Sequence, residues 1–310
     1  MNKIIVFGSF VVDLMARGSH LPVPGETVKS TMFQMGPGGK GFNQGIAANR
    51  AGGDVAMITK VGKDSFADVA LELMKKESMS AEYVFITDKT PTGAALIMVD
   101  EKTSQNAIMV TSGACGTFND EDIAKIEPAI KNAEILLIQL ETNLDAVEKV
   151  IDIAHNNGVK VVLNPAPVQQ ISDDLLKKID IITPNEVEAA ILTGITVNNT
   201  DDARKAAQYF LEKGVKEVVI TLGKAGVLAV TNEKYQIFEN YDVKAVDTTG
   251  AGDAFNGGFV TALSEGKDIF AACRFGNVVS NLAVTKVGTA VAMLTRAEID
   301  EFIKKNNIDV

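Results

Sequence analysis

Residues 247–255, with the sequence DTTGAGDAF, carry the side chains best suited to chemistry. They end a β-rich run and open a segment of small residues, so Asp253 and several backbone N–H groups should lie at a helix N-terminus. Glycine lets the backbone approach a ligand closely, and the first helical turn favours negative charge, which should also keep Asp253 ionised. We therefore expect phosphoryl transfer to an alcohol, in which Asp253 accepts the hydroxyl proton. The phosphate would be held by Gly250, Ala251 and Gly252.

The simpler interpretation of this stretch is a strand-to-helix turn that only caps the helix. A cap requires neither the two glycines nor the preceding Asp247. The anion site is therefore the favoured interpretation.

A second glycine cluster lies at residues 36–44. It fits the GxGxxG spacing of dinucleotide folds, but that fingerprint should follow the first buried strand, which ends far upstream at Gly8. A Walker loop is excluded because Lys40 is followed by Gly41 rather than by Ser or Thr. We expect a loop that wraps a small polar ligand such as a polyol, with donors from Lys40 and Asn43. The alternative is a flexible turn with a solvated lysine.

Polar residues also follow two buried runs further along the chain. Asn185 and Glu188 come directly after residues 179–182, at the carboxyl end of a strand, where open α/β sheets bind ligands. Their spacing of three puts both on one helix face, where the Glu188 carboxylate would organise Mg²⁺ through water. The alternative is a plain helix N-terminus, capped by Asn185. A further run, 218–222, ends in residues that either line a phosphate or ribose or form only a tight turn: Thr221, Gly223 and Gly226.

Short, nearly continuous apolar runs alternate with segments of helical periodicity. Each run is bounded by polar residues or glycine, as expected of strands buried on both faces of a mainly parallel sheet. The runs are residues 4–7, 55–58, 135–140, 161–163, 179–182 and 218–222. This alternation predicts a three-layer α/β/α fold with a doubly wound, mainly parallel sheet.

Two regions break this alternation. Residues 27–35 alternate like a half-exposed strand, and residues 92–99 with 107–110 are typical of a hairpin. We expect a small antiparallel flap, formed by about 14–40 and 92–111 within a single domain of residues 1–310, that closes over the site as a β lid. The alternative is a simple extension of the sheet edge. An exposed hairpin edge can pair with a second copy, so a homodimer through the lid is expected.

The composition excludes several classes of protein. The 310 residues are 46% hydrophobic and 23% charged, enough for a full core. A formal net charge of −10 argues against nucleic acid or a membrane as partner. The sequence shows neither a membrane-spanning run nor a signal peptide, so a cytoplasmic location is expected. Two cysteines and two histidines without ligand spacing predict neither a disulfide framework nor a metal site of their own: Cys115, Cys273, His20 and His155.

Five motifs, in order, make the chain resemble a known family. They are GGKGFNQ (38–44), NPAP (164–167), PNEVE (184–188), TLG (221–223) and DTTGAGDAF (247–255). They span almost the whole chain, and the first combined with the last is specific. The chain is similar to the ribokinase-like (PfkB) carbohydrate kinases.

The resemblance implies a role for each site residue. Asp253 would be the catalytic base, with an anion hole of Gly250, Ala251 and Gly252. The sugar would contact Asp13, Gly39, Lys40, Asn43 and Glu141. ATP and its Mg²⁺ would be bound by Asn185, Glu188, Thr221, Gly223 and Gly226, with the adenine facing Asn277. An activating K⁺ would be held by Asp247 and by main-chain oxygens of Thr249, Ala283 and Gly288.

The expected reaction is transfer of the γ-phosphoryl group of ATP to a primary hydroxyl of a small sugar, in first place ribose, giving ribose 5-phosphate. Val11 stands where ribokinases usually carry Asn, and an apolar residue there loses a sugar hydrogen bond. The alternatives are therefore 2-deoxyribose, fructose or another sugar. Ala292 stands where the family usually has Ser, which removes one expected K⁺ ligand.

Two other classes of function remain as alternatives. A non-catalytic sugar-binding sensor would keep the pocket of Lys40 and Asn43 without needing Asp253. A nicotinamide-dependent oxidoreductase would need a first strand directly before the glycine cluster and an acidic partner about 20 residues beyond it.

Overall fold

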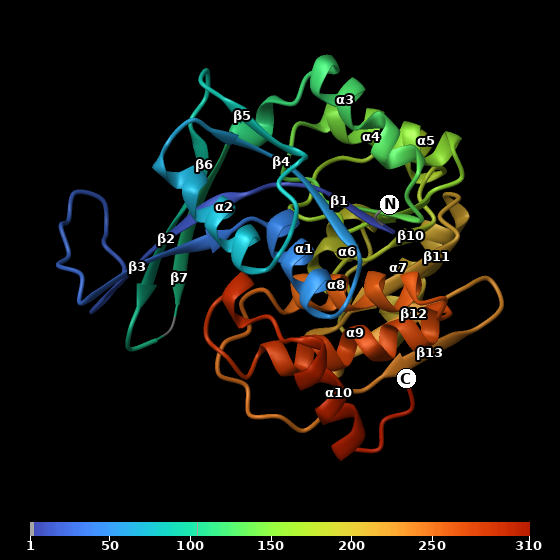
Figure 1. Cartoon of the computed structure of the whole chain (residues 1–310). Coiled ribbons are helices and arrows are strands. Elements are labelled where there is room, and N and C mark those ends of the chain that lie inside the picture. The colour runs from blue at the N-terminus through green and yellow to red at the C-terminus, as the bar shows by residue number, and fades with distance from the viewer. Residues whose placement is uncertain (1–2, 104) are drawn as a thin grey trace.

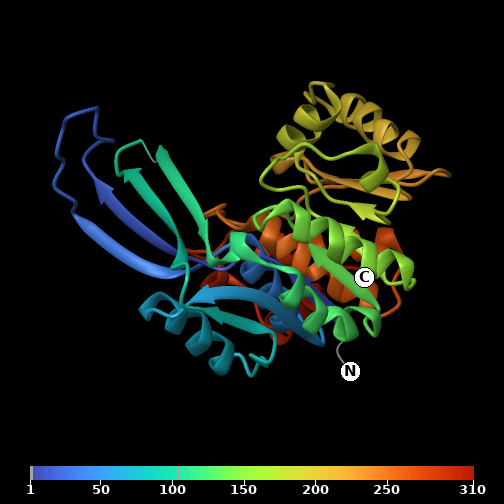
Figure 2. The same cartoon turned by 90° about the horizontal axis from the view of Figure 1, so that it is seen from above.

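A nine-stranded, mostly parallel sheet lies between two layers of helices, with a separate four-stranded sheet projecting on one side (Figures 1 and 2). The computed structural model describes residues 3–103 and 105–310. Within these ranges no helix is both long and apolar enough to cross a membrane. The predicted three-layer α/β/α fold is confirmed.

The large sheet places the first strand of the described chain third from one edge. In spatial order its strands are β13 (Tyr235–Phe238), β12 (Val227–Val230), β11 (Glu217–Thr221), β10 (Ile181–Ile182), β9 (Lys160–Leu163), β8 (Ile135–Ile138), β1 (Ile4–Phe7), β4 (Val55–Gly62) and β5 (Val84–Thr87). Within the described residues, β12 is antiparallel to both of its neighbours, β11 and β13, and the other strand pairs of this sheet are parallel. The carboxyl ends of the parallel strands therefore meet at one edge of the layer, where this class of sheet binds its ligands.

Helices cover both faces of the large sheet. One layer contains α1 (Lys40–Arg50), α2 (Ser65–Lys76), α8 (Ala251–Ser264), α9 (Ile269–Ala283) and α10 (Arg296–Lys305). The other contains α3 (Asp120–Lys131), α4 (Leu144–Asn156), α5 (Asp173–Leu176), α6 (Glu186–Thr193) and α7 (Thr200–Glu212). Three short 3₁₀ helices are η1 (Ala114–Thr117), η2 (Gly223–Ala225) and η3 (Ala290–Ala292).

The strands inside the large sheet contribute to both hydrophobic cores because their side chains alternate between the two faces. In β1, Ile4 and Val6 pack under one helical layer, and Ile5 and Phe7 pack under the other. This explains why the buried strands are continuous apolar runs in the sequence.

The small sheet consists of β3 (Met32–Gly38), β2 (Val11–Gly18), β6 (Thr92–Asp100) and β7 (Asn106–Gly113), in that spatial order. The predicted hairpin of β6 and β7 is present. The prediction of a purely antiparallel flap is wrong, because the central strands β2 and β6 pair in parallel. The predicted strand at residues 27–35 also begins later, at Met32.

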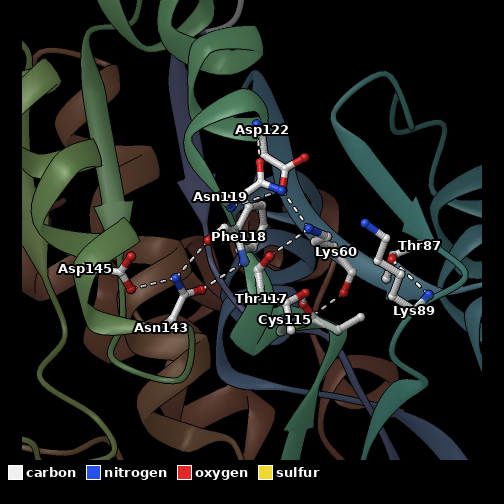
Figure 3. A network of polar contacts seen from close by, with 11 residues as sticks. Lys60, Thr87, Lys89, Cys115, Thr117, Phe118, Asn119, Asp122, Asn143 and Asp145 are labelled. Carbon is white, nitrogen blue, oxygen red and sulfur yellow. Dashed lines mark hydrogen bonds and ion pairs between the residues drawn. The ribbon is translucent and has the colours of Figure 1, made fainter.

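A buried polar network fixes the segment that leaves the small sheet (Figure 3). The Nζ of Lys60, on β4, donates to Thr117 O at 2.8 Å and to Asp122 Oδ2 at 2.6 Å. The thiol of Cys115 donates to Lys60 O at 3.0 Å. Asn143 makes two hydrogen bonds with the backbone of Phe118. The segment from η1 to the start of α3 is thereby tied to the large sheet, which gives the small sheet a fixed base.

Candidate active site

A cavity of about 160 Å³ opens at the carboxyl edge of the large sheet. It lies beyond the ends of β9, β10 and β11, beside the first turn of α8. Its lining is mainly polar: Lys40, Asn164, Ala166, Thr183, Asn185, Glu188, Thr221, Thr248, Gly250, Ala251, Gly252, Asp253 and Asn256. A site of this kind suits a small, charged ligand.

The carboxylate of Asp253 lines this cavity and is held on both of its oxygens. Asp253 lies in the first turn of α8 and is 8% exposed. Asn43 Nδ2 donates to Oδ2 at 3.0 Å, and Gln44 Nε2 donates to Oδ1 at 3.0 Å. Both donors come from α1, which packs beside α8 (Figure 1). The carboxylate is therefore fixed in orientation at the cavity wall.

Glycine makes this close helix contact possible. A Cβ placed on Gly257 would lie 2.4 Å from the Cβ of Ala47 and 2.8 Å from the carbonyl oxygen of Gln44. Gly257 stands one helical turn after Asp253, on the same side of α8. Its missing side chain lets α1 approach until Asn43 and Gln44 reach the carboxylate.

The pKa of Asp253 shifts in the direction opposite to the one expected from the helix N-terminus. Burial raises the pKa of Asp253, and the charge of Glu141 raises it further. The charge of Lys40 and the hydrogen bonds from Gln44 and Asn43 lower this pKa. Desolvation outweighs the favourable groups, so the direction of the shift is the opposite of the one expected. A raised pKa suits a carboxylate that must take up a proton.

The turn before α8 has the geometry of an anion site. Gly250 is the N-cap residue and has a left-handed backbone, with φ of 75°. The N–H of Ala251 donates to Thr248 O at 3.2 Å. The N–H groups of Gly252 and Asp253 belong to the first turn, where helix geometry leaves them without intrahelical acceptors. This part of the turn is thus suited to hold phosphate oxygens.

A second group of polar residues surrounds the amino end of α1. The backbone N–H of Lys40 donates to Glu141 Oε2 at 2.8 Å, and the hydroxyl of Ser9 donates to the same oxygen. Burial, with the charges of Glu141 and Asp253, raises the pKa of Asp13 to about 6, against a hydrogen bond to Thr289. The electrostatic coupling places Asp13, Glu141 and Asp253 around one site.

Two details of this group favour a sugar. Gly39, the N-cap of α1, has φ of 91°, and a Cβ on Gly38 would lie 2.1 Å from Asp13 Oδ1. Gly38 thus leaves room for the carboxylate of Asp13. The buried Oδ1 of Asn43 has no hydrogen-bond partner in the described chain. It remains an acceptor for a hydroxyl group, as the predicted sugar contact requires.

The lysine of this loop is placed between carboxylates rather than solvated. Burial opposes the charge of Lys40, but the carboxylates of Asp253, Glu141 and Glu188 raise its pKa. Lys40 therefore stays protonated at the junction of the two groups of polar residues. The alternative of a flexible turn with a solvated lysine is excluded.

Asn185 and Glu188 form a capping box at the start of α6 and also line the cavity. Asn185 Oδ1 accepts from Glu188 N at 2.8 Å, and Glu188 Oε2 accepts from Asn185 N at 2.9 Å. Burial raises the pKa of Glu188, against the N–H of Asn185 and the charge of Lys40. The helix-cap interpretation is confirmed, and because both residues also line the cavity, their role toward ATP and Mg²⁺ stays a prediction that this position allows.

The donor set fits a magnesium ion that keeps much of its water. Within the described residues no group of three or more His, Cys, Asp or Glu could hold a metal. Glu188 contributes one cavity-lining carboxylate with Oε2 already bonded to Asn185 N. Mg²⁺ is commonly bound in this way, by one carboxylate with waters and substrate phosphates.

Three residues predicted to serve the nucleotide lie outside the cavity lining. Gly223 begins η2, and its carbonyl accepts from Asn240 Nδ2 at 2.8 Å. Gly226 has φ of 94° and precedes β12. Asn277 is buried and donates to Glu239 O at 2.8 Å. Thr221 does line the cavity, beside Asn185, with which it forms a β-bridge.

Asp247 joins the two loops in which the potassium ligands were expected. Its Oδ1 accepts from Thr249 N at 3.0 Å, and its Oδ2 accepts from Gly288 N at 3.0 Å. Ala283 ends α9, and its carbonyl accepts from Lys286 N at 3.1 Å. Ala292 is buried in η3. The carboxylate thus joins the loop before α8 to the loop after α9.

The motifs assign no role to several buried polar residues around Asp253. Gln44 contacts the carboxylate directly, and Asn256 Nδ2 donates to Gly252 O at 2.9 Å. Three more of these polar residues could have been predicted from the sequence, because each directly follows a buried strand at the carboxyl edge of the sheet, where ligands bind. These three are Gln139 after β8, Asn164 after β9 and Thr183 after β10.

Comparison with known proteins agrees with this geometry. The family model of the pfkB family of carbohydrate kinases matches residues 1–296. A ribokinase of Haemophilus influenzae is 43% identical over 98% of this chain and 99% of its own length. A deoxyribokinase of Salmonella typhi is 34% identical over 98% and 99%. The structure of Arabidopsis thaliana ribokinase complexed with ribose and ATP has a TM-score of 0.90 and 28% identity, over 98% and 99% of the two chains. The chain belongs to the pfkB family of carbohydrate kinases.

Proposed function

We propose that this protein phosphorylates a small sugar with ATP, and that ribose is the substrate, giving ribose 5-phosphate. The observation that carries the proposal is the buried Asp253 carboxylate. It is oriented by Asn43 and Gln44 and lies at a helix N-terminus in a polar cavity. A ribokinase of Haemophilus influenzae and an Arabidopsis thaliana ribokinase bound to ribose and ATP, which this chain resembles over nearly its full length, support the choice of substrates.

In this mechanism Asp253 accepts the proton of the primary hydroxyl as that oxygen attacks the γ-phosphorus. Gly250, Ala251 and Gly252 hold the transferring phosphoryl group, since most of the catalysis is positioning and charge stabilisation. Lys40 adds positive charge, and the sugar is held by Asp13, Gly39, Asn43 and Glu141. The nucleotide would lie toward Asn185, Thr221, Gly223, Gly226 and Asn277. Glu188 would hold Mg²⁺ through water, and the ion would supply positive charge that neutralises the phosphates.

The direct test is a panel of sugars with ATP and Mg²⁺, scored for ADP release and for the position of the new phosphate. We expect ribose to be the best substrate and the phosphate to be on O5. If 2-deoxyribose or fructose is phosphorylated at least as fast as ribose, ribose is not the preferred substrate. Failure of every sugar to release ADP would contradict the kinase itself.

A second sugar, 2-deoxyribose, is favoured by one feature of the site. Val11 is buried at the start of β2, two residues before Asp13 and on the same face of the strand. An apolar side chain there offers no partner to a 2-hydroxyl group, and a deoxyribokinase of Salmonella typhi is among the relatives. Val11→Asn should lower the KM for ribose relative to 2-deoxyribose by about tenfold or more. If the ratio of kcat/KM for ribose to kcat/KM for 2-deoxyribose is unchanged, Val11 does not determine the sugar specificity.

We also propose K⁺ as an activator, bound beside the anion turn by Asp247 and by the main-chain oxygens of Thr249, Ala283 and Gly288. The loop pair joined by Asp247 supports this, and the presence of Ala292 weakens the expected ligand set. Running the sugar panel with and without K⁺ measures the activation.

The small sheet is proposed to act as a lid within a single domain of residues 1–310, formed by about 14–40 and 92–111. Asp13 lies on β2 of this sheet, so movement of the sheet would carry this proposed sugar-binding residue toward Asp253. Its edge is also proposed to pair two copies into a homodimer. A cytoplasmic location stays a prediction of the sequence.

A further inference from the structure

The buried amide of Gln44 stands between the proposed base and a second buried amide. Gln44 Nε2 donates to Asp253 Oδ1 at 3.0 Å and to Asn164 Oδ1 at 3.0 Å. Gln44 Oε1 accepts from Gln139 Nε2 at 2.6 Å. Gln44 and Gln139 are both 0% exposed. The carboxylate is therefore the end of a chain of amides that reaches into the core.

The direction of each hydrogen bond in this chain is fixed by chemistry. An ionised carboxylate only accepts hydrogen bonds, so Gln44 must present its NH₂ group to Asp253 and its oxygen to Gln139. Asn164 Nδ2 donates to Thr183 O at 2.9 Å, which leaves Asn164 Oδ1 to accept from Gln44. Turning any one of these amides over would place two donors or two acceptors against each other.

Gln139 holds its orientation in spite of an unsatisfied atom. Its buried Oε1 has no partner in the described chain, and a buried polar atom without a hydrogen bond destabilises the fold. A Cβ on Gly8 would lie 2.2 Å from this oxygen, so the glycine leaves room for it. The unsatisfied oxygen is explained if the NH₂ group of Gln139 is needed to hold Gln44.

We propose that Gln44 is a positioning residue that holds Asp253 in one orientation and in its ionised form, and that Gln139 holds Gln44 from behind. The kinetic consequence rests on the proposed kinase function. The hydrogen bonds themselves do not, so the inference can be tested on the carboxyl group directly.

The charges around Asp253 determine the sign of the expected effect. Lys40 on α1 faces it as a cation, while Glu141 after β8, Asp13 on β2 and Glu188 on α6 face it as carboxylates. Burial raises the pKa of Asp253, and the Gln44 amide is one of the groups that lower it. Without that amide the protonated, inactive form persists to higher pH, so the acid limb of the kcat profile moves upward.

The test uses Gln44→Met and Gln139→Met, which keep side-chain length and remove the amides. Gln44→Met should lower kcat about 10²-fold, with the sugar KM within about threefold, and move the acid limb up by about one pH unit. Gln139→Met should also lower kcat and move the acid limb upward, but by smaller amounts than Gln44→Met. Thr261→Val is the control: it removes a buried hydroxyl that bonds Ala48 O between α1 and α8, and it should leave the pH profile unchanged.

A second readout separates this inference from the proposed function. NMR titration of ¹³C-carboxyl-labelled aspartate follows Asp253 itself, with its signal assigned by its absence in Asp253→Asn. An upward shift of its midpoint in both methionine variants supports the positioning role, even if no sugar is phosphorylated. An unchanged midpoint in Gln44→Met overturns it. If that variant does not fold, the midpoint of Gln139→Met decides in the same way.

Discussion

At the scale of single residues, Asp13 should set the pH dependence of sugar binding. Burial and two neighbouring carboxylates raise its pKa to about 6, so it is protonated below that pH and ionised above it. Only the ionised form accepts hydrogen bonds from a diol with both oxygens. We expect the sugar KM to rise about tenfold from pH 7 to pH 5, and Asp13→Asn to abolish this dependence.

Stability provides an independent check on Asp13. Because the pKa is raised in the folded state, the ionised side chain destabilises the fold, and this penalty grows as pH rises from the ordinary pKa toward about 6. Asp13→Asn should therefore raise the Tm more at pH 8 than at pH 5. The exposed Asp88→Asn serves as control and should show no such difference. If the Tm gain of Asp13→Asn is the same at both pH values, the pKa of Asp13 is not raised in the folded state and this account is contradicted.

At the scale of elements, the contact between α1 and α8 brings the site together. Gly257→Ala would place a Cβ 2.4 Å from that of Ala47, so the helices must separate. Such overpacking typically costs about 1–3 kcal/mol, and a shift of about 1 Å at the reacting groups costs about 10²-fold in rate. We expect a lower Tm and a fall in kcat larger than the change in KM.

The matched control for this contact is Gly116→Ala, in η1. A Cβ there meets its nearest neighbour, Ser112, at 3.4 Å, which is ordinary contact. Its kcat should equal that of the wild type. Full activity of Gly257→Ala would show that the helix spacing does not position Asp253.

At the scale of the whole molecule, the small sheet presents an exposed apolar face. In one row across the sheet, Leu14 pairs with Met35 on one side and with Leu96 on the other, and Leu96 pairs with Met109. In the next row, Ala16 pairs with Phe33 and with Met98. This face is opposite the one that carries Asp13. An apolar surface of this kind is typical of an interface, and we expect this face, together with the edge of the small sheet, to be covered by the second copy in the proposed homodimer.

Light scattering coupled to size-exclusion chromatography measures this assembly. The wild type should have twice the monomer mass, and Met109→Lys should shift the mass toward the monomer. Ile86→Lys, at an exposed apolar position on β5, should leave it unchanged. A wild type with the mass of one chain would contradict the homodimer.

The sequence predicts those parts of the fold whose signal is local. Residues 4–7 and 135–138 form strands because they are continuous apolar runs buried on both faces. The parallel pairing of β2 with β6 joins segments about 80 positions apart, and no local pattern reports it. The run 179–182 also overstates β10, which has only 2 residues.

The same distinction applies to the candidate site. Asp253 is visible in the sequence because glycines and a helix start surround it, and Lys40 and Glu188 lie in motifs of the same kind. The contacts of Gln44 with Asp253 and Gln139 span 209 and 95 positions, so they depend on how α1 packs. The direction of the pKa shift at Asp253 depends on burial, which a helix start alone does not determine.

The central claim is that Asp253 takes the proton from the sugar hydroxyl, and Asp253→Asn tests it most directly. The variant keeps the size of the side chain but replaces one accepting oxygen by an NH₂ group, so it retains only one of the two hydrogen bonds donated by Asn43 and Gln44. With ribose, ATP and Mg²⁺, kcat should fall by about 10² to 10⁴, while the affinities for sugar and ATP, measured by calorimetry, stay within about tenfold. A variant that turns over ribose at close to the wild-type rate would contradict the account.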